Sequence, residues 1–171
     1  MTPAATHGAR IVEALRAAKI DLVATLPDAW LGPAISAIEA APDMTLMRVT
    51  REDEAVAICA GAWLGGRRGA VLAQNAGLLL STNVLAAYAL HHQIPILLLI
   101  AQRGRHDDDQ YYQSYKGQVT VPVVEAIGLP YRIIEDPADI GAIAQVWMQA
   151  YLARRPGVVL LSRRALVGTA P

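Results

Sequence analysis

Residues 70 to 102 contain no Asp, Glu, Lys or Arg, and this absence of charge constrains the fold more than any other feature. The stretch holds two apolar runs, at 70–73 and 94–101, with a predicted helix at 81–92 between them. Short apolar runs are typical of strands buried on both faces, as in parallel sheets covered by helices. Amide and imidazole side chains interrupt the stretch, which therefore lacks the roughly 18 consecutive apolar residues of a membrane-spanning helix. It predicts the centre of an α/β domain.

The same alternation of strand and helix runs through the whole chain. Apolar residues at helical spacing predict helices, and short β-rich runs predict the strands between them. The expected helices lie at 5–18, 30–38, 53–65, 81–92, 119–127 and 137–153, and the expected strands at 20–25, 45–50, 70–73, 94–101, 131–134 and 158–161. Asp28 and Asp136 are predicted helix N-caps. We therefore expect residues 1–171 to form a single three-layer α/β/α domain around a mostly parallel, six-stranded sheet.

The composition limits the partners and the cellular location that we expect for the chain. With 54% hydrophobic and 18% charged residues, part of its surface is expected to be buried in a subunit interface. A formal net charge of zero gives no reason to expect binding to nucleic acid or to an acidic membrane surface. The single Cys59 excludes an intramolecular disulfide, and the N-terminus shows no signal-peptide pattern. A reducing, cytoplasmic location is the expectation that follows.

Glu52 stands where a predicted strand ends and an apolar helix begins. In open α/β sheets, ligands bind in the crevice beyond the carboxyl ends of the strands, so this carboxylate is a candidate for binding or catalysis. Acidic residues in the first turn of a helix are also favoured by the helix dipole and by free backbone N–H groups. That simpler explanation covers Asp53 and Glu54 completely. For Glu52, position alone leaves both explanations open.

Three further polar features each have a structural and a functional interpretation. Asn75 follows a predicted strand. Its side-chain amide either contacts a ligand or hydrogen-bonds the backbone of its own turn. His91 and His92 lie near the C-terminal end of a predicted helix, where the helix dipole favours a protonated imidazole. A capping role is therefore expected for at least one of them. Arg103 opens a polar, tyrosine-bearing loop over residues 103–117, where it is either a solvated side chain or a contact for an anionic group.

The sequence lacks generic motifs of nucleotide, metal and nucleophile chemistry. It contains no G-x-G-x-x-G, Walker A, H-E-x-x-H, G-x-S-x-G or cysteine pair. The acidic run 107–109 is predicted to be a solvated loop, because three consecutive side chains do not converge easily on one ion. The glycines at 61, 65 and 66 are interpreted as the end of a helix.

An ordered set of short motifs instead resembles a known family. The set comprises Leu26-Pro27-Asp28-Ala29-Trp30-Leu31, Glu52 nine residues before Gly61, Gln74-Asn75-Ala76-Gly77, residues 86–95, Gln102-Arg103-Gly104, Gly117 and Gly128-Leu129-Pro130-Tyr131. In this order the motifs resemble the pyrimidine-binding (PYR) domain of thiamine-diphosphate enzymes, in particular sulfopyruvate decarboxylase α subunits and the corresponding half of phosphonopyruvate decarboxylase. The chain departs from that pattern at Ala76 and Leu79-Leu80, where the relatives have serine and Gly-Asn. The added bulk leaves room for a more apolar oxo acid.

The resemblance implies a PYR-domain fold and a part in decarboxylating a small 2-oxo acid. It implies that Glu52 hydrogen-bonds the aminopyrimidine ring of thiamine diphosphate and so promotes formation of the C2 ylide. The cofactor-binding residues implied are Glu52, Pro27, Gln74 and Asn75, and the substrate-binding residues are Asn75, His92 and Arg103. The cofactor supplies the chemistry, and the protein supplies its placement and one carboxylate.

The resemblance also implies a partner. The diphosphate-binding half of these enzymes carries Gly-Asp-Gly and a later Asn, which hold Mg²⁺ and the diphosphate, and this chain has no Gly-Asp-Gly. A separate β subunit with that motif is therefore expected, in a hetero-oligomer such as two α with two β subunits, with no metal ligand from this chain.

Three alternatives stay open at the level of the sequence. They are another two-subunit thiamine-diphosphate enzyme, one that forms a carbon–carbon bond; a non-catalytic α/β ligand-binding module; and a purely structural partner. A receiver-like switch fits poorly, because it needs clustered acids after the first strand and a late lysine. The chain offers only Asp28 and Lys116.

Overall fold

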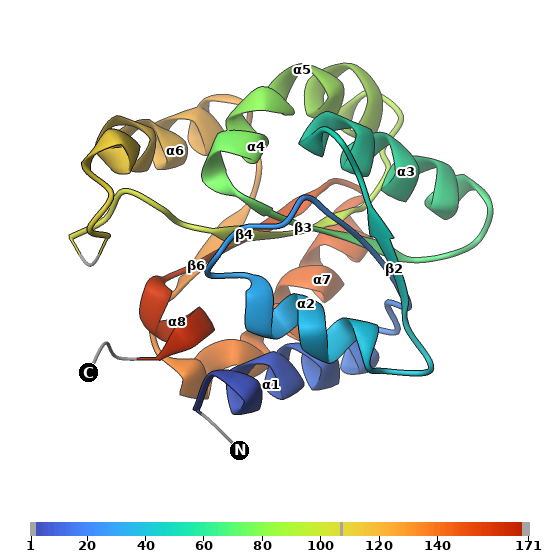
Figure 1. Ribbon diagram of the computed structural model, residues 1–171. Coiled ribbons are helices and arrows are strands. Elements are labelled where there is room, and N and C mark those ends of the chain that lie inside the picture. Colours follow the sequence, from blue (N-terminus) through green and yellow to red (C-terminus); the bar gives the residue numbers. More distant parts are fainter. Residues whose placement is uncertain (1–2, 107, 169–171) are drawn as a thin grey trace.

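Six parallel strands form one sheet in the residues that the computed structural model describes, 3–106 and 108–168 (Figure 1). The strand order is β2-β1-β3-β4-β6-β5, and every neighbouring pair is parallel. The strands are β1 (Leu22–Thr25), β2 (Thr45–Arg48), β3 (Gly69–Gln74), β4 (Leu97–Ala101), β5 (Tyr131–Ile134) and β6 (Gly157–Leu161). The predicted six-stranded parallel sheet is confirmed.

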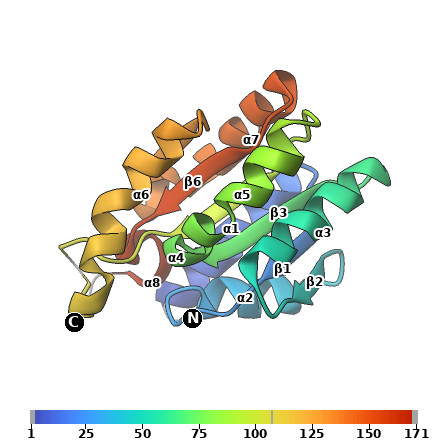
Figure 2. The same ribbon diagram turned by 90° about the horizontal axis from the view of Figure 1, so that it is seen from above.

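Helices cover both faces of this sheet. One layer contains α1 (Pro3–Ala17), α2 (Gly32–Glu39), the 3₁₀-helix η3 (Pro137–Gly141), α7 (Ala142–Ala153) and α8 (Arg163–Val167). The other contains α3 (Glu52–Leu64), α4 (Asn75–Leu80), α5 (Thr82–Val84), the π-helical η1 (Leu85–Leu90), the 3₁₀-helix η2 (Tyr111–Gln113) and α6 (Ser114–Ala126). Figure 2 views the molecule from this second layer, with α3, α5 and α6 lying over the strands. The three-layer prediction is therefore also confirmed.

The apolar strands supply two cores, one on each face of the sheet. Within β4, Leu97 and Leu99 pack with the α1 and α7 layer, while Leu98 and Ile100 pack with the α3 layer. All four are buried, which explains why this strand shows no polar alternation in the sequence. Trp147 of α7 is 1% exposed and is one of the largest side chains in the first core.

The boundaries of several elements differ from the predicted ones for identifiable reasons. The helix after β3 begins at Asn75, so residues 75–80, which precede the predicted helix at 81–92, are already helical. The predicted helix at 137–153 is divided, because Asp136 caps a 3₁₀ turn by accepting the N–H of Ala138 before α7 begins. Its capping role is confirmed. Gly65 and Gly66 end α3 as expected, with Gly66 at a φ of +82°.

The prediction that Asp28 caps the second helix is wrong. The N-cap position of α2 is Leu31, with no capping side chain. Asp28 instead accepts the N–H of Trp30 at 2.9 Å and forms an ion pair with Arg103. The helix begins only at Gly32, too far along the chain for Asp28 to occupy its N-cap position. In the described ranges, no helix is long and apolar enough to cross a membrane.

Candidate functional site

The sheet topology places several predicted residues along one edge. Because all strands are parallel, their carboxyl ends share that edge, and the order of β2, β1 and β3 reverses the direction of winding beside β1. Such a reversal is where α/β sheets bind ligands. Pro27 follows β1, Glu52 follows β2 and Asn75 follows β3, so the fold brings these three loops to the same edge.

Glu52 is the first residue of α3 and is 8% exposed. Its two acidic neighbours have local partners: Asp53 pairs with Arg51 at 3.0 Å, and Glu54 accepts the N–H and hydroxyl of Thr50 at 3.1 Å. No hydrogen bond or ion pair among the described residues involves the Glu52 carboxylate, and its oxygens are not among the enclosed atoms that lack a partner, so they keep some exposure. Asp53 and Glu54 thus account for the local stabilisation that the helix start requires, and the buried Glu52 carboxylate is left available for a ligand.

Gly77 of α4 lies against the Glu52 carboxyl group. A Cβ atom built on residue 77 would stand 2.6 Å from Oε1 of Glu52 and closer still to the two carbons beside it. Real Cβ atoms do not approach other heavy atoms this closely, so a larger residue at position 77 would force the Glu52 side chain to move from its present place. The sequence motif contained Gly77 without showing what it contacts.

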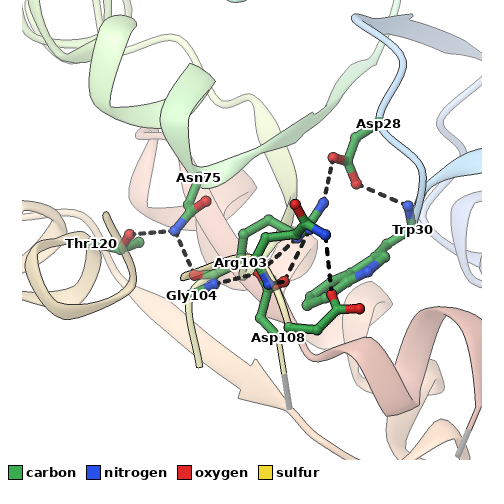
Figure 3. Close-up of polar contacts among 9 residues, drawn as sticks. Asp28, Trp30, Asn75, Arg103, Gly104, Asp108 and Thr120 are labelled. Atoms are coloured by element: carbon green, nitrogen blue, oxygen red, sulfur yellow. Dashed lines mark hydrogen bonds and ion pairs between the residues drawn. The ribbon is translucent and has the colours of Figure 1, made fainter. Parts of the chain in front are cut away.

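Asn75 is fully buried and connects three segments (Figure 3). Its Nδ2 donates to the carbonyl of Arg103 at 3.0 Å and to Oγ1 of Thr120 at 2.9 Å. The interpretation of Asn75 as a turn amide that satisfies its own backbone is therefore wrong. Among the described residues, Oδ1 of Asn75 and Oε1 of the adjacent Gln74 are buried without a hydrogen-bond partner. Unsatisfied buried polar atoms are uncommon, so these two oxygens are candidates for a contact with a bound group or a water molecule.

Arg103 is held between two carboxylates and an aromatic ring (Figure 3). Its Nε and Nη2 donate to Asp108 at 2.8 and 3.0 Å, and its Nη1 donates to Asp28 at 3.0 Å. The guanidinium carbon lies 4.1 Å from the centre of the Trp30 ring. The side chain is 7% exposed, so the interpretation of Arg103 as a solvated loop arginine is wrong. These contacts use three of the five guanidinium N–H donors and neutralise the charge that a substrate anion would otherwise meet.

The predicted solvated acidic loop is wrong for Asp108. Its side chain is 0% exposed, and it accepts hydrogen bonds from Arg103 and from the N–H groups of Gly104 and Gln110. Burial alone would raise the pKa of Asp108, but these hydrogen bonds hold that pKa below its usual value. Asp109 is exposed, and residue 107 lies outside the described residues. Within the described ranges, no group of three or more His, Cys, Asp or Glu side chains could hold a metal ion.

His91 and His92 lie apart from this site. They follow η1 and precede β4, whereas Arg103 follows β4, so the length of a strand separates the histidines from the carboxyl edge. Both are exposed, and their ring centres are 4.8 Å apart. The described structure therefore does not bring His92 together with Glu52, Asn75 or Arg103.

Comparison with known families identifies the family to which the chain belongs. The family described as "Thiamine pyrophosphate enzyme, N-terminal TPP binding domain" matches residues 5–127. The match covers most of the chain and includes every element that surrounds Glu52. The chain belongs to this family of thiamine pyrophosphate enzyme N-terminal (PYR) domains.

Individual relatives narrow the similarity further. The chain is 34% identical over 129 residues to sulfopyruvate decarboxylase subunit alpha of Methanococcus maripaludis, covering 75% of this chain and 77% of the relative. It is 33% identical to the subunit of the same name from Methanothermobacter thermautotrophicus, covering 73% and 76%. It is also 32% identical to phosphonopyruvate decarboxylase of Streptomyces viridochromogenes, covering 86% of this chain and 37% of that longer protein.

The polar groups at the carboxyl edge fit an aminopyrimidine ring. Such a ring offers both donors and acceptors, and Glu52 presents a buried carboxylate with no protein partner in the described chain. The oxygens of Gln74 and Asn75 are acceptors without a partner in the described chain, although both are enclosed by protein, and Gly77 lies against Glu52. These residues match the chemistry of the pyrimidine half of thiamine diphosphate.

Proposed function

We propose that this chain is the α (PYR) subunit of a heteromeric, thiamine-diphosphate-dependent 2-oxo acid decarboxylase. Family membership supports the cofactor, and the names of the relatives support decarboxylation of a sulfopyruvate-like or phosphonopyruvate-like acid. The observation that carries the proposal is the Glu52 carboxylate, which belongs to a residue that is 8% exposed, has no protein partner in the described chain, and stands at the carboxyl edge against Gly77 of α4.

In this proposal, each residue of the chain has a limited task. Glu52 shares a proton with the ring nitrogen of the aminopyrimidine, and Pro27, Gln74 and Asn75 bound the ring. When bound, thiamine diphosphate would supply the nucleophilic carbon and accept the electron pair that stays behind when carbon dioxide departs. General acid–base work of the kind assigned to Glu52 contributes about 10²- to 10⁴-fold in rate.

The proposed substrate contacts differ in how well the geometry supports them. A direct contact from Arg103 requires an anion to displace Asp28 or Asp108, and one from Asn75 requires the amide to become exposed. His92 lies at the other edge of the sheet in this chain. Direct contacts from these three residues stay predictions, and we assign no substrate group to them.

The proposed enzyme needs a second polypeptide. Mg²⁺ and the diphosphate are assigned to a β subunit with Gly-Asp-Gly and a later Asn, in a hetero-oligomer of α and β chains. Two of the relatives are named as alpha subunits, which supports a partner. Apolar side chains exposed on the α3 layer also support one: Leu64 is 71% exposed, Leu80 46% and Tyr88 48%.

Co-expression with a candidate β chain tests the proposal. The partner is sought in the adjacent reading frame, as a chain with Gly-Asp-Gly. The purified pair is assayed with thiamine diphosphate, Mg²⁺ and several 2-oxo acids for carbon dioxide release, beside each chain alone. We expect turnover from the pair only. Robust turnover by this chain alone would refute the split site, and a product with a new carbon–carbon bond would favour the two-subunit carboligase.

A further inference from the structure

Arg103 connects loops that are distant in the sequence. It follows β4, and its partner Asp28 follows β1, a separation of 75 residues. Its other partner, Asp108, lies five residues further along the same loop. We refer to Asp28, Trp30, Arg103 and Asp108 as the Arg103 clamp. Figure 3 shows Arg103 between the two carboxylates and over the Trp30 ring.

The clamp is closed to solvent and internally satisfied. The side chains of Arg103, Asp28 and Asp108 are 7%, 7% and 0% exposed. Each carboxylate also accepts backbone N–H groups, from Trp30 for Asp28 and from Gly104 and Gln110 for Asp108. Buried charges are tolerated when their remaining hydrogen-bonding capacity is filled in this way. A lysine cannot reproduce the fork that Arg103 presents to Asp108.

Contacts lead from the clamp to Glu52. The carbonyl of Arg103 accepts the Nδ2 of Asn75, which is the first residue of α4. Two residues further into α4, Gly77 lies against the Glu52 carboxyl group. A fixed loop at Arg103 therefore fixes the start of α4, and this in turn fixes the position of Gly77 beside Glu52. On the other side, Asp28 holds the loop that contains Pro27.

Glycines make a second connection between the loop and α6. A Cβ on Gly117 would stand 2.9 Å from the carbonyl oxygen of Arg103, and Gly104 adopts a φ of +78° against the backbone of Gln113. No side chain fits at these points, so the loop packs backbone against backbone. The backbone of Arg103 and Gly104 is thus held on one side by the clamp and on the other by close contact with α6.

We propose that Arg103 is a positioning residue: with Asp28 and Asp108 it holds the loops after β1, β3 and β4 in the arrangement that places Asn75, Gly77 and Glu52. In this role its guanidinium binds the protein's own carboxylates and no substrate anion. The part of this inference that concerns activity rests on the proposed function. The part that concerns the loops is independent of it.

Hydrogen exchange of the isolated wild-type and variant chains tests the structural part. Arg103→Gln and the nearly isosteric Asp108→Asn should each raise exchange about tenfold or more across residues 75–80 and 103–113. The matched control is Arg16→Gln, because Arg16 makes the same two-pronged contact with Asp43, at 2.8 and 2.6 Å, on the exposed surface of α1. The control should leave both segments unchanged. Unchanged exchange in both clamp variants would overturn the proposal.

If Arg103→Gln fails to fold, Asp28→Asn provides the same test, because it keeps the shape of the side chain and removes one carboxylate. If Arg103→Gln does fold, adding it to the Asp108→Asn background should raise exchange little further, since the two residues act as one unit. Fully additive effects would contradict a clamp.

Kinetics of the assembled enzyme distinguish a positioning role of Arg103 from direct binding of the substrate's second anionic group. Positioning predicts that Arg103→Lys lowers kcat by a similar factor for 2-oxo acids with and without a second anionic group, while KM changes little. If Arg103 instead binds the substrate directly, KM should rise only for the sulfonate or phosphonate acids, and hydrogen exchange should stay unchanged. That result would overturn the proposal. If the wild-type pair shows no turnover, the proposed function fails, and hydrogen exchange still decides the clamp.

Discussion

Gly77 and Glu52 contact each other so closely that a single methyl group on residue 77 would overlap the carboxyl group, at 2.6 Å from Oε1. This contact joins the start of α3 to α4, two helices that follow different strands. It also explains a glycine inside a helix, where glycine is ordinarily unfavourable by about 0.5–1 kcal/mol relative to alanine.

Gly77→Ala should therefore destabilise the chain despite the better helix propensity of alanine. Overpacking costs about 1–3 kcal/mol, which exceeds the propensity gain. Chemical denaturation of the isolated chain measures the change in the free energy of unfolding. Gly61→Ala in α3 is the control, because a Cβ there meets nothing within 4 Å, and it should leave stability equal or higher. Equal effects at the two positions would show that Gly77 is not confined by Glu52.

Cys59 should be unreactive in the folded chain. It is 0% exposed, and burial raises the pKa of its thiol to about 12. At about pH 8, about one thiol in ten thousand is then the reactive thiolate. We expect slow labelling by a thiol reagent in buffer and rapid labelling in concentrated guanidinium chloride. Fast labelling without denaturant would place Cys59 outside the core.

Asp108 should make the free energy of unfolding depend on pH in the acidic range. Its pKa in the folded chain is lowered, so its contribution is present above the unfolded value of about 3.9 and is lost as pH falls through the lower folded value. The stability difference between the wild type and Asp108→Asn should therefore shrink when pH falls below about 4, as measured by denaturant unfolding at several pH values. A difference that stays constant from neutral pH into this range would contradict the buried ion pair.

The parts of the fold that depend on local pattern were predictable. The apolar strands, the three layers and the Asp136 cap all follow from short-range spacing, and the structure confirms them. The start of α4 was missed because polar Gln74 and Asn75 look like a turn, whereas long-range contacts from Asn75 to Arg103 and Thr120 support a helix there.

The candidate site was predictable only in part, for the same reason. Glu52 is identifiable because charge falls abruptly after it at the end of a strand. The pairing of Arg103 with Asp28 crosses 75 residues, and one sequence contains no signal for it. Asp108 looked like one acid in a solvated run, although its partner Arg103 lies only five residues away.

The decarboxylation rate of Glu52→Gln in the assembled α and β complex tests the central claim most directly. Glutamine keeps the shape of the side chain beside Gly77 and removes the proton-sharing carboxylate. We expect kcat to fall by about 10²-fold or more, with assembly unchanged, while the adjacent Asp53→Asn control keeps nearly full activity. Wild-type turnover by Glu52→Gln would contradict a catalytic carboxylate at position 52.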